Sequence, residues 1–190
     1  SVGDILEMVK TLRKDCDLPI VFFAYFNTIL AFGIEEFARK AHECGVDGVL
    51  VLDLPPEEAK YYKSLMDARD IATIFLVSPV TPDDRLPLIV LQATGFVYYV
   101  SQMGVTGMRD RMDERIPAMV EKIRRLTATP VAVGFGVSTP DHVREIARYA
   151  DGVIVGSSIV RRIAERAGTP GLVREVGEFA GSLTAPLSAG

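Results

Sequence analysis

The chain has 190 residues, of which 48% are hydrophobic and 24% charged, and its net charge is −4. This balance indicates one globular domain, and the acidic charge argues against a nucleic-acid or anionic-membrane partner. Its two cysteines and two histidines show no metal-ligand spacing, which predicts no metal site and reduced thiols, as in the cytoplasm.

A helical pattern over residues 2–14 comes first, followed by the most apolar segment, residues 18–34. That segment is short for a membrane span and is interrupted by Asn27, Thr28 and Gly33. We interpret it as a buried strand leading into a loop. The N-terminal residues also lack the basic and apolar regions of a signal peptide. The sequence therefore predicts a soluble, cytoplasmic protein.

Short apolar runs recur along the chain with helical patterns between them. Their hydrophobicity is nearly continuous, which is typical of parallel strands covered on both faces. The predicted strands are residues 20–25, 48–52, 71–77, 96–100, 130–133 and 152–155.

Three segments between these runs have features of helices. Residues 34–44 are followed by Gly45, as a C-cap glycine would be, and residues 57–68 form a second predicted helix. A third, at residues 116–126, carries one apolar stripe. The stripe consists of Ile116, Met119, Val120, Ile123 and Leu126.

A fourth predicted helix begins near residue 138. Ser138 and Asp141 have the spacing of a capping box, and Pro140 falls inside the first turn.

Alternation of strands and helices indicates βα units and a parallel sheet. Such an array is either a doubly wound sheet or a (β/α)8 barrel, of which six strands are present here. The first predicted strand runs into "AYFNT" and not into the glycines usual in doubly wound nucleotide-binding folds. Periodicity alone leaves both architectures open.

Glycines follow the last two strands, in "AVGFGVS" and "VIVGSSIV". Glycine allows backbone N–H groups to approach an anion closely, and a helix start adds a favourable dipole. The alternative is that Gly134, Gly136 and Gly156 simply permit tight turns. Two such motifs on consecutive strands favour a phosphate site, as the loops after strands seven and eight form in many barrels.

The connection after residue 100 is long and begins "SQMGVTG". Gly107 is expected to join the anion site, and the charged run 108–115 to form a mobile lid over the ligand. A solvated surface excursion is the alternative. A mobile lid predicts tryptic cleavage at Arg109, Arg111 and Arg115 in the unliganded protein.

The ends of other predicted strands carry apolar or aromatic side chains in place of glycines. Tyr25, Leu76, Tyr98 and Phe135 are apolar or aromatic, which suggests a ligand with one anionic end and one flat apolar end, although each can equally be core. Asp53, in "VLDLPPEE", is either functional or a cap, with Pro55 or Pro56 opening the next helix.

Taken together, the motifs of this chain closely resemble those of the tryptophan synthase α subunit. The matching stretches, in chain order, are "FAYFN" at 23–27, "GVDGVLVLDLPPEE" at 45–58, "SQMGVTG" at 101–107, "VGFGVSTP" at 133–140 and "GVIVGSSIV" at 152–160. This family is a (β/α)8 TIM barrel that cleaves indole-3-glycerol phosphate to indole and glyceraldehyde 3-phosphate. The resemblance implies a single barrel domain over residues 1–190.

The resemblance also implies roles for individual residues. Thr106 would support catalysis at the lid hinge. The phosphate ligands would be Gly107, Gly136, Gly156 and Ser157, and the indole pocket Tyr25, Leu76, Tyr98 and Phe135. The partner-facing residues would be Asn27, Asp53 and Pro55. The partner is a β subunit that holds pyridoxal phosphate in an α2β2 assembly, so the resemblance implies no cofactor in this chain.

One part of the family pattern has no counterpart in this sequence. The catalytic glutamate and aspartate lie on and after the family's second strand, whereas the helix at residues 2–14 matches the helix that follows it. The chain would then supply family strands three to eight and lack the acid–base pair.

Three functions are therefore compatible with the sequence. The first is the lyase subunit, and the second a catalytically inactive fragment that binds phosphate and docks on the β subunit. The third is another phosphate-binding barrel such as an indoleglycerol-phosphate synthase. That enzyme would be expected to place lysine and glutamate at strand ends, and none is found there.

Overall fold

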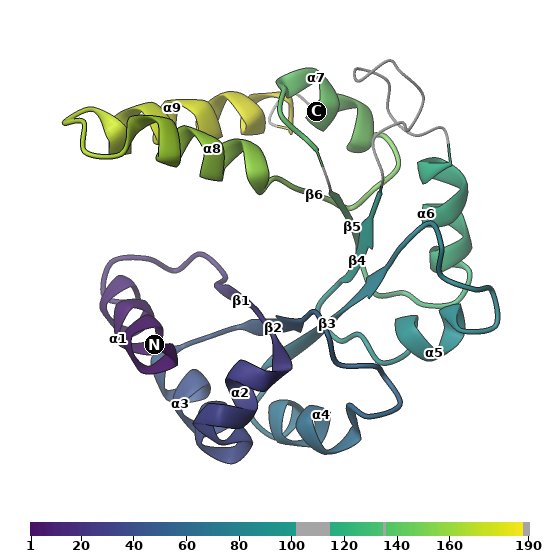
Figure 1. The fold of residues 1–190 in the computed structure, drawn as a ribbon. Helices are drawn as coiled ribbons and strands as arrows, with labels where there is room; N and C mark the ends of the chain where they lie inside the picture. Colours follow the sequence, from purple (N-terminus) through teal and green to yellow (C-terminus); the bar gives the residue numbers. More distant parts are fainter. Residues whose placement is uncertain (102–114, 135, 188–190) are drawn as a thin grey trace. The chain divides into compact units, whose positions relative to one another are not determined.

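The computed structural model describes residues 1–101, 115–134 and 136–187 (Figure 1). The chain divides into two compact units, Ser1–Leu76 with Pro82–Val97, and Val77–Thr81 with Tyr98–Gly190. Strands and helices alternate along each unit, as predicted.

The first unit is built on parallel strands. Val21 lies opposite Gly48 in the pairing of β1 with β2, and Gly48 lies opposite Ala72 in that of β2 with β3. All four residues of β2 are buried. The strands of this unit are β1 (Val21–Ala24), β2 (Gly48–Val51) and the greater part of β3 (Ala72–Val77), each within one or two residues of its predicted bounds.

Helices gather beside these strands (Figure 1). They are α1 (Val2–Leu12), α2 (Phe26–Phe32), α3 (Ile34–Cys44), α4 (Lys60–Asp67) and α5 (Leu86–Val90). The helix predicted at 34–44 is confirmed to the residue. Its C-cap Gly45 has a φ of 82° and a left-handed backbone, which glycine adopts without a Cβ penalty.

Two predictions in this unit were wrong. The segment after β1 is a helix and not a loop, since residues 26–32 form α2 and bury Ile29. The helix predicted at 57–68 is confirmed over Lys60–Asp67, but its predicted start was wrong by three residues. Turns precede it, in which Glu58 and Ala59 donate their N–H groups to the carbonyls of Pro55 and Pro56, so neither proline opens the helix.

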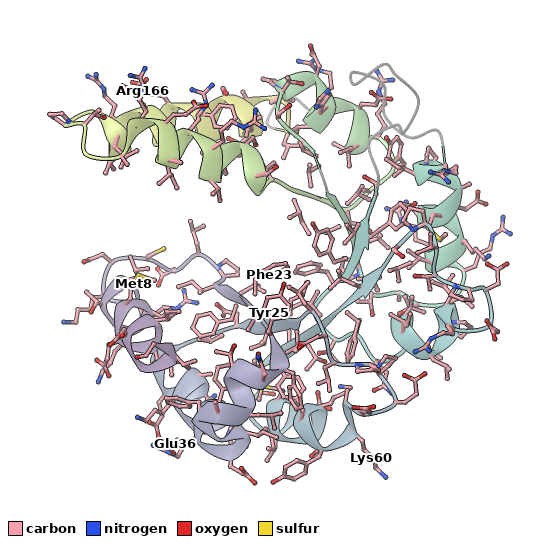
Figure 2. The ribbon with its side chains drawn as sticks, viewed as in Figure 1. Met8, Phe23, Tyr25, Glu36, Lys60 and Arg166 are labelled. Carbon is pink, nitrogen blue, oxygen red and sulfur yellow. The ribbon has the colours of Figure 1, made fainter. Side chains whose placement is uncertain are left out.

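Strand β1 also departs from the expectation of strands covered on both faces. Val21 and Phe23 are exposed, and Figure 2 labels Phe23. Among the described residues β1 pairs with β2 alone. An apolar groove of about 450 Å³ lies along α1 and β1. Its lining includes Ile5, Met8, Leu12, Val21, Phe23 and Tyr25.

The second unit continues the alternation after β4 (Val97–Val100), whose first residue belongs to the first unit. Strands β5 and β6 are parallel, and the Ser101 N–H group donates to the Gly134 carbonyl. Arg162 of α8 stacks 3.9 Å from the Phe179 ring of α9, and these helices lie side by side (Figure 1). The other elements are α6 (Ile116–Arg124), β5 (Val131–Gly134), α7 (Pro140–Ile146), β6 (Gly152–Ile154), α8 (Ser157–Arg166), α9 (Leu172–Thr184) and the short 3₁₀ helix η1 (Ala185–Leu187).

The cap of α7 differs from the prediction by one residue. Thr139 is the N-cap, and its Oγ1 accepts from the His142 N–H group at 3.2 Å. Ser138 and Asp141 therefore do not form a capping box. The position of Pro140 in the first turn is confirmed.

In each unit, an aspartate side chain joins the N-terminal ends of two paired strands. In the first unit Asp47 accepts from the Ile20 N–H group at 2.6 Å and pairs with Arg13, which also donates to the Gly45 carbonyl. We call this set the Asp47 bridge.

The Asp151 bridge is its counterpart in the second unit. Asp151 accepts from the Val131 N–H group at 2.8 Å and pairs with Arg124 at 2.6 Å. In both bridges the aspartate immediately precedes the second strand of the pair, and the arginine comes from the end of the helix before the first strand.

Candidate functional site

The loops after β5 and β6 are tied together in the second unit. Ser158 Oγ, in the first turn of α8, donates a hydrogen bond to the Val137 carbonyl at 2.9 Å. Ser158 is only 8% exposed, so this bond is largely shielded from water. The two glycine motifs predicted to bind an anion therefore lie side by side.

The start of α8 is the open part of this arrangement. Gly156 is the N-cap and Ser157 the first helical residue, and both are exposed. The first N–H groups of a helix have no carbonyl partner within it. No acidic side chain occupies the first turn of α8, so its positive helix end is not neutralised there.

The glycines around this helix start serve different purposes. A Cβ on Gly134 would lie 2.8 Å from Ile154 Cβ and 3.1 Å from Tyr98 Oη, and Gly136 has a φ of 72°. Packing and backbone conformation thus account for these two glycines. Gly156 has a φ of −122°, outside the left-handed region, and a Cβ there would meet no atom of the described residues within 4 Å. Its missing side chain leaves the helix start accessible to a ligand.

Several predicted site residues lie outside the described residues. These are Thr106, Gly107 and Phe135, together with residues 108–114 of the expected lid. Arg115, the last residue of that run, immediately precedes α6.

The indole-pocket candidates that the structure describes occur in both units. Tyr25 follows β1 and is 58% exposed, and Leu76 lies in β3 with a partly exposed side chain. In the second unit, Tyr98 of β4 is half-buried close to Gly134, and burial raises the pKa of its hydroxyl. Tyr98 is therefore a neutral, mainly apolar wall beside the glycine loops.

The three partner-facing candidates lie in the first unit. Asn27 and Pro55 are exposed, and Asn27 Oδ1 accepts from the Thr28 hydroxyl at 3.2 Å. Asp53 Oδ1 accepts from the Phe26 N–H group at 2.6 Å. Asp53 is thus a cap, as one alternative held, but it serves α2 and not the helix that follows it.

Sequence reasoning missed two contributors to these sites. Ser158 belongs to the motif "VGSSIV", but no role was predicted for it. Its position as the second serine of that motif is the feature that could have suggested a hydrogen bond to the neighbouring loop. Phe26 carries the N–H group that Asp53 binds, and no local pattern identifies a backbone donor two segments away.

Within the described ranges, no helix is long and apolar enough to cross a membrane. In the same ranges, no group of three or more His, Cys, Asp or Glu side chains is placed to hold a metal ion.

Comparison with known proteins gives one consistent result. The family model described as tryptophan synthase alpha chain matches residues 1–184. The tryptophan synthase alpha chain of Opitutus terrae is 43% identical over 186 residues, which covers 97% of this chain and 70% of that protein. The corresponding chain of Geobacter sulfurreducens is 46% identical over 183 residues, covering 96% and 69%.

A solved structure agrees with these relatives. A chain from the tryptophan synthase α2β2 complex of Pyrococcus furiosus superposes with a TM-score of 0.88 at 35% identity, covering 97% of this chain and 74% of that one. The fold is therefore α/β of the TIM-barrel type, with six parallel strands in the part of this chain that is described.

Proposed function

The chain belongs to the tryptophan synthase alpha chain family, and on that premise we propose that it is the lyase subunit that cleaves indole-3-glycerol phosphate to indole and glyceraldehyde 3-phosphate. The observation that carries the proposal is the hydrogen bond from Ser158 to Val137. It brings two glycine loops together around an open helix start, which is suited to a phosphate group.

In this proposal the phosphate binds at the start of α8. Gly156 and Ser157 offer backbone N–H groups and a hydroxyl, and Gly136 and Gly107 contribute backbone from the neighbouring loops. Tyr25, Leu76, Tyr98 and Phe135 have the indole-lining role, and Thr106 supports catalysis at the hinge of a lid. These assignments rest on the family motifs, and the open space at Gly156 supports that of the phosphate.

Cleavage of the C–C bond requires protonation of the indole ring carbon and removal of a proton from a hydroxyl group. Among the described strand ends, only Asp53 carries a carboxylate, and that group is bonded to the Phe26 N–H group. We therefore infer that this chain supplies family strands three to eight of a single barrel domain. The acid and base then come from strand–helix units outside this sequence.

The same observation favours a second candidate function. Without its acid and base, the 190-residue chain alone binds phosphate and docks on a β subunit but does not turn over substrate. Incubating it with indole-3-glycerol phosphate and measuring released indole separates the candidates. Turnover by the chain alone would show that an acid–base pair exists within it.

The partner in this proposal is a tryptophan synthase β subunit, as in the α2β2 complex of Pyrococcus furiosus. Asn27, Asp53 and Pro55 face it, and it holds the pyridoxal phosphate, while this chain needs no cofactor. We place the complex in the cytoplasm, which the two unpaired cysteines, Cys16 and Cys44, support.

The phosphate site is tested by adding a negative charge at its centre. Two like charges about 4 Å apart near a protein surface repel by about 4 kcal/mol. Gly156→Glu should therefore weaken binding of indole-3-propanol phosphate, a non-cleavable analogue, by roughly 1,000-fold in calorimetry. Ala164→Glu is the matched control, because it adds the same charge to an exposed position of α8 two turns away. Equal affinities for the two variants would refute the assigned phosphate position.

A further inference from the structure

Asp53 joins the ends of two neighbouring strands. Its Oδ1 accepts from the Phe26 N–H group at 2.6 Å, and the preceding Leu52 N–H group donates to the Ala24 carbonyl at 3.0 Å. The turn from β1 into α2 is therefore held by two consecutive residues at the end of β2.

Helix α2 depends on this external acceptor. Its N-cap, Tyr25, makes no side-chain capping bond, and the first turn contains no acidic residue. A helix start without a cap leaves N–H groups unsatisfied, and the side-chain oxygen of Asp or Asn is a preferred acceptor for them. Asp53 supplies that oxygen from another segment of the chain.

The Phe26 side chain is fixed by the same part of the unit. Its ring meets the ring of Tyr62, in α4, edge to face at a centroid distance of 5.9 Å and an interplanar angle of 83°. Tyr62 is 2% exposed, so it provides a rigid surface. The backbone and the side chain of Phe26 are thus both held by the segment that follows β2.

The two residues that flank Phe26 in the sequence both have a role in the proposed function. Tyr25 belongs to the indole pocket and Asn27 to the partner face. Because each shares a peptide bond with Phe26, fixing the Phe26 amide sets the direction in which both side chains leave the backbone.

We propose that Asp53 is a positioning residue, which acts as a hydrogen-bond acceptor for α2 and thereby sets Tyr25 for the indole ring and Asn27 for the partner. This inference rests on the proposed function. It assigns Asp53 no proton transfer, and it makes one turn common to the ligand site and the partner surface.

The test compares Asp53→Ala with Asp53→Asn, since asparagine keeps an acceptor oxygen but loses the charge. Loss of one hydrogen bond corresponds to roughly 5- to 10-fold in affinity. Asp53→Ala should weaken binding of indole and of the β subunit by about that factor, and leave the affinity for inorganic phosphate within about twofold. Asp53→Asn should retain all three affinities. Glu58→Ala, which removes an exposed carboxylate from the same segment, is the control.

Amide hydrogen exchange gives a readout that does not depend on any ligand. The Phe26 amide should exchange about 5- to 10-fold faster in Asp53→Ala and at the wild-type rate in Asp53→Asn and Glu58→Ala. Unchanged exchange in Asp53→Ala, or a loss of phosphate affinity equal to that of indole, would overturn the inference. Equal damage from the alanine and asparagine variants would do so as well, because charge would then be the requirement. A wild-type chain that binds neither indole nor phosphate would instead refute the proposed function, and the exchange experiment would still decide the role of Asp53.

Discussion

The β1–β2 and β5–β6 pairs are alike at one end and different at the other. At their starts both are closed by an aspartate that accepts an N–H group at or just before the first strand and pairs with an arginine. At their carboxyl ends, the first pair carries Asp53 and aromatic residues, and the second carries glycines and Ser158. In a parallel α/β fold, the starting ends of the strands therefore hold the structure together, whereas the carboxyl ends vary with function.

The largest effect that tests this comparison is expected from removing the bridges. Arg13 has a side chain only 20% exposed, whereas that of Arg124 is 44% exposed. Asp47→Ala leaves a partly buried guanidinium without its carboxylate, bonded only to backbone carbonyls, and should cost about 1–2 kcal/mol of unfolding free energy. Asp151→Ala should cost about 1 kcal/mol, because water can replace the lost partner.

Urea denaturation measures the loss of unfolding free energy in each of the two alanine variants. Amide hydrogen exchange then shows which strand pair has been weakened. The asparagine variants at the same positions are the controls, since they keep the acceptor for the strand N–H group. Equal losses at Asp47 and Asp151 would show that the burial of the arginine does not matter.

A smaller difference is expected at the glycine that follows each aspartate. A Cβ on Gly48 would lie 2.9 Å from Ile74 Cδ1 and 3.3 Å from the Ala72 carbonyl oxygen, whereas one on Gly152 would lie 3.4 Å from Ala132 Cβ. Gly48→Ala should therefore destabilise the protein by about 1 kcal/mol. Gly152→Ala should be neutral or slightly stabilising, since alanine restricts the unfolded chain. Thermal unfolding of the two variants side by side tests this, and the reverse order would contradict the packing described.

The smallest expected effect is the dependence of the β5–β6 pair on pH. The hydrogen bond from the Val131 N–H group, with help from Arg124, lowers the pKa of Asp151 below its ordinary value of 3.8. A lowered pKa means that this contribution to stability is present above pH 3.8 and is lost as the pH falls through the folded-state pKa. Urea midpoints from pH 7 to pH 2.5 should fall less steeply below pH 4 for Asp151→Asn than for the wild type. Parallel curves would show that Asp151 contributes nothing to the acid sensitivity.

Periodicity predicted the strands well because each apolar run begins at or directly after a charged residue, glycine or proline. It missed α2 because Phe26–Phe32 continues the apolar run of β1, and only Asn27 and Thr28 interrupt it. For α7, Pro140 at the first helical position already points to Thr139 as the cap, and the spacing from Ser138 to Asp141 obscured that signal. The family motifs identified Gly156, but they did not contain the Ser158 bond or the partner of Asp53, because both join segments far apart in the sequence.

The aspartate bridges also have a consequence for the order in which the protein folds. The hydrogen bonds from Ile20 to Asp47 and from Val131 to Asp151 span 27 and 20 residues, and the most distant partners in either bridge are 34 residues apart. Loops this short cost little entropy to close, and domains are synthesised from their N-terminus. Each strand pair can therefore close as soon as its own residues have left the ribosome, before the next pair has been made.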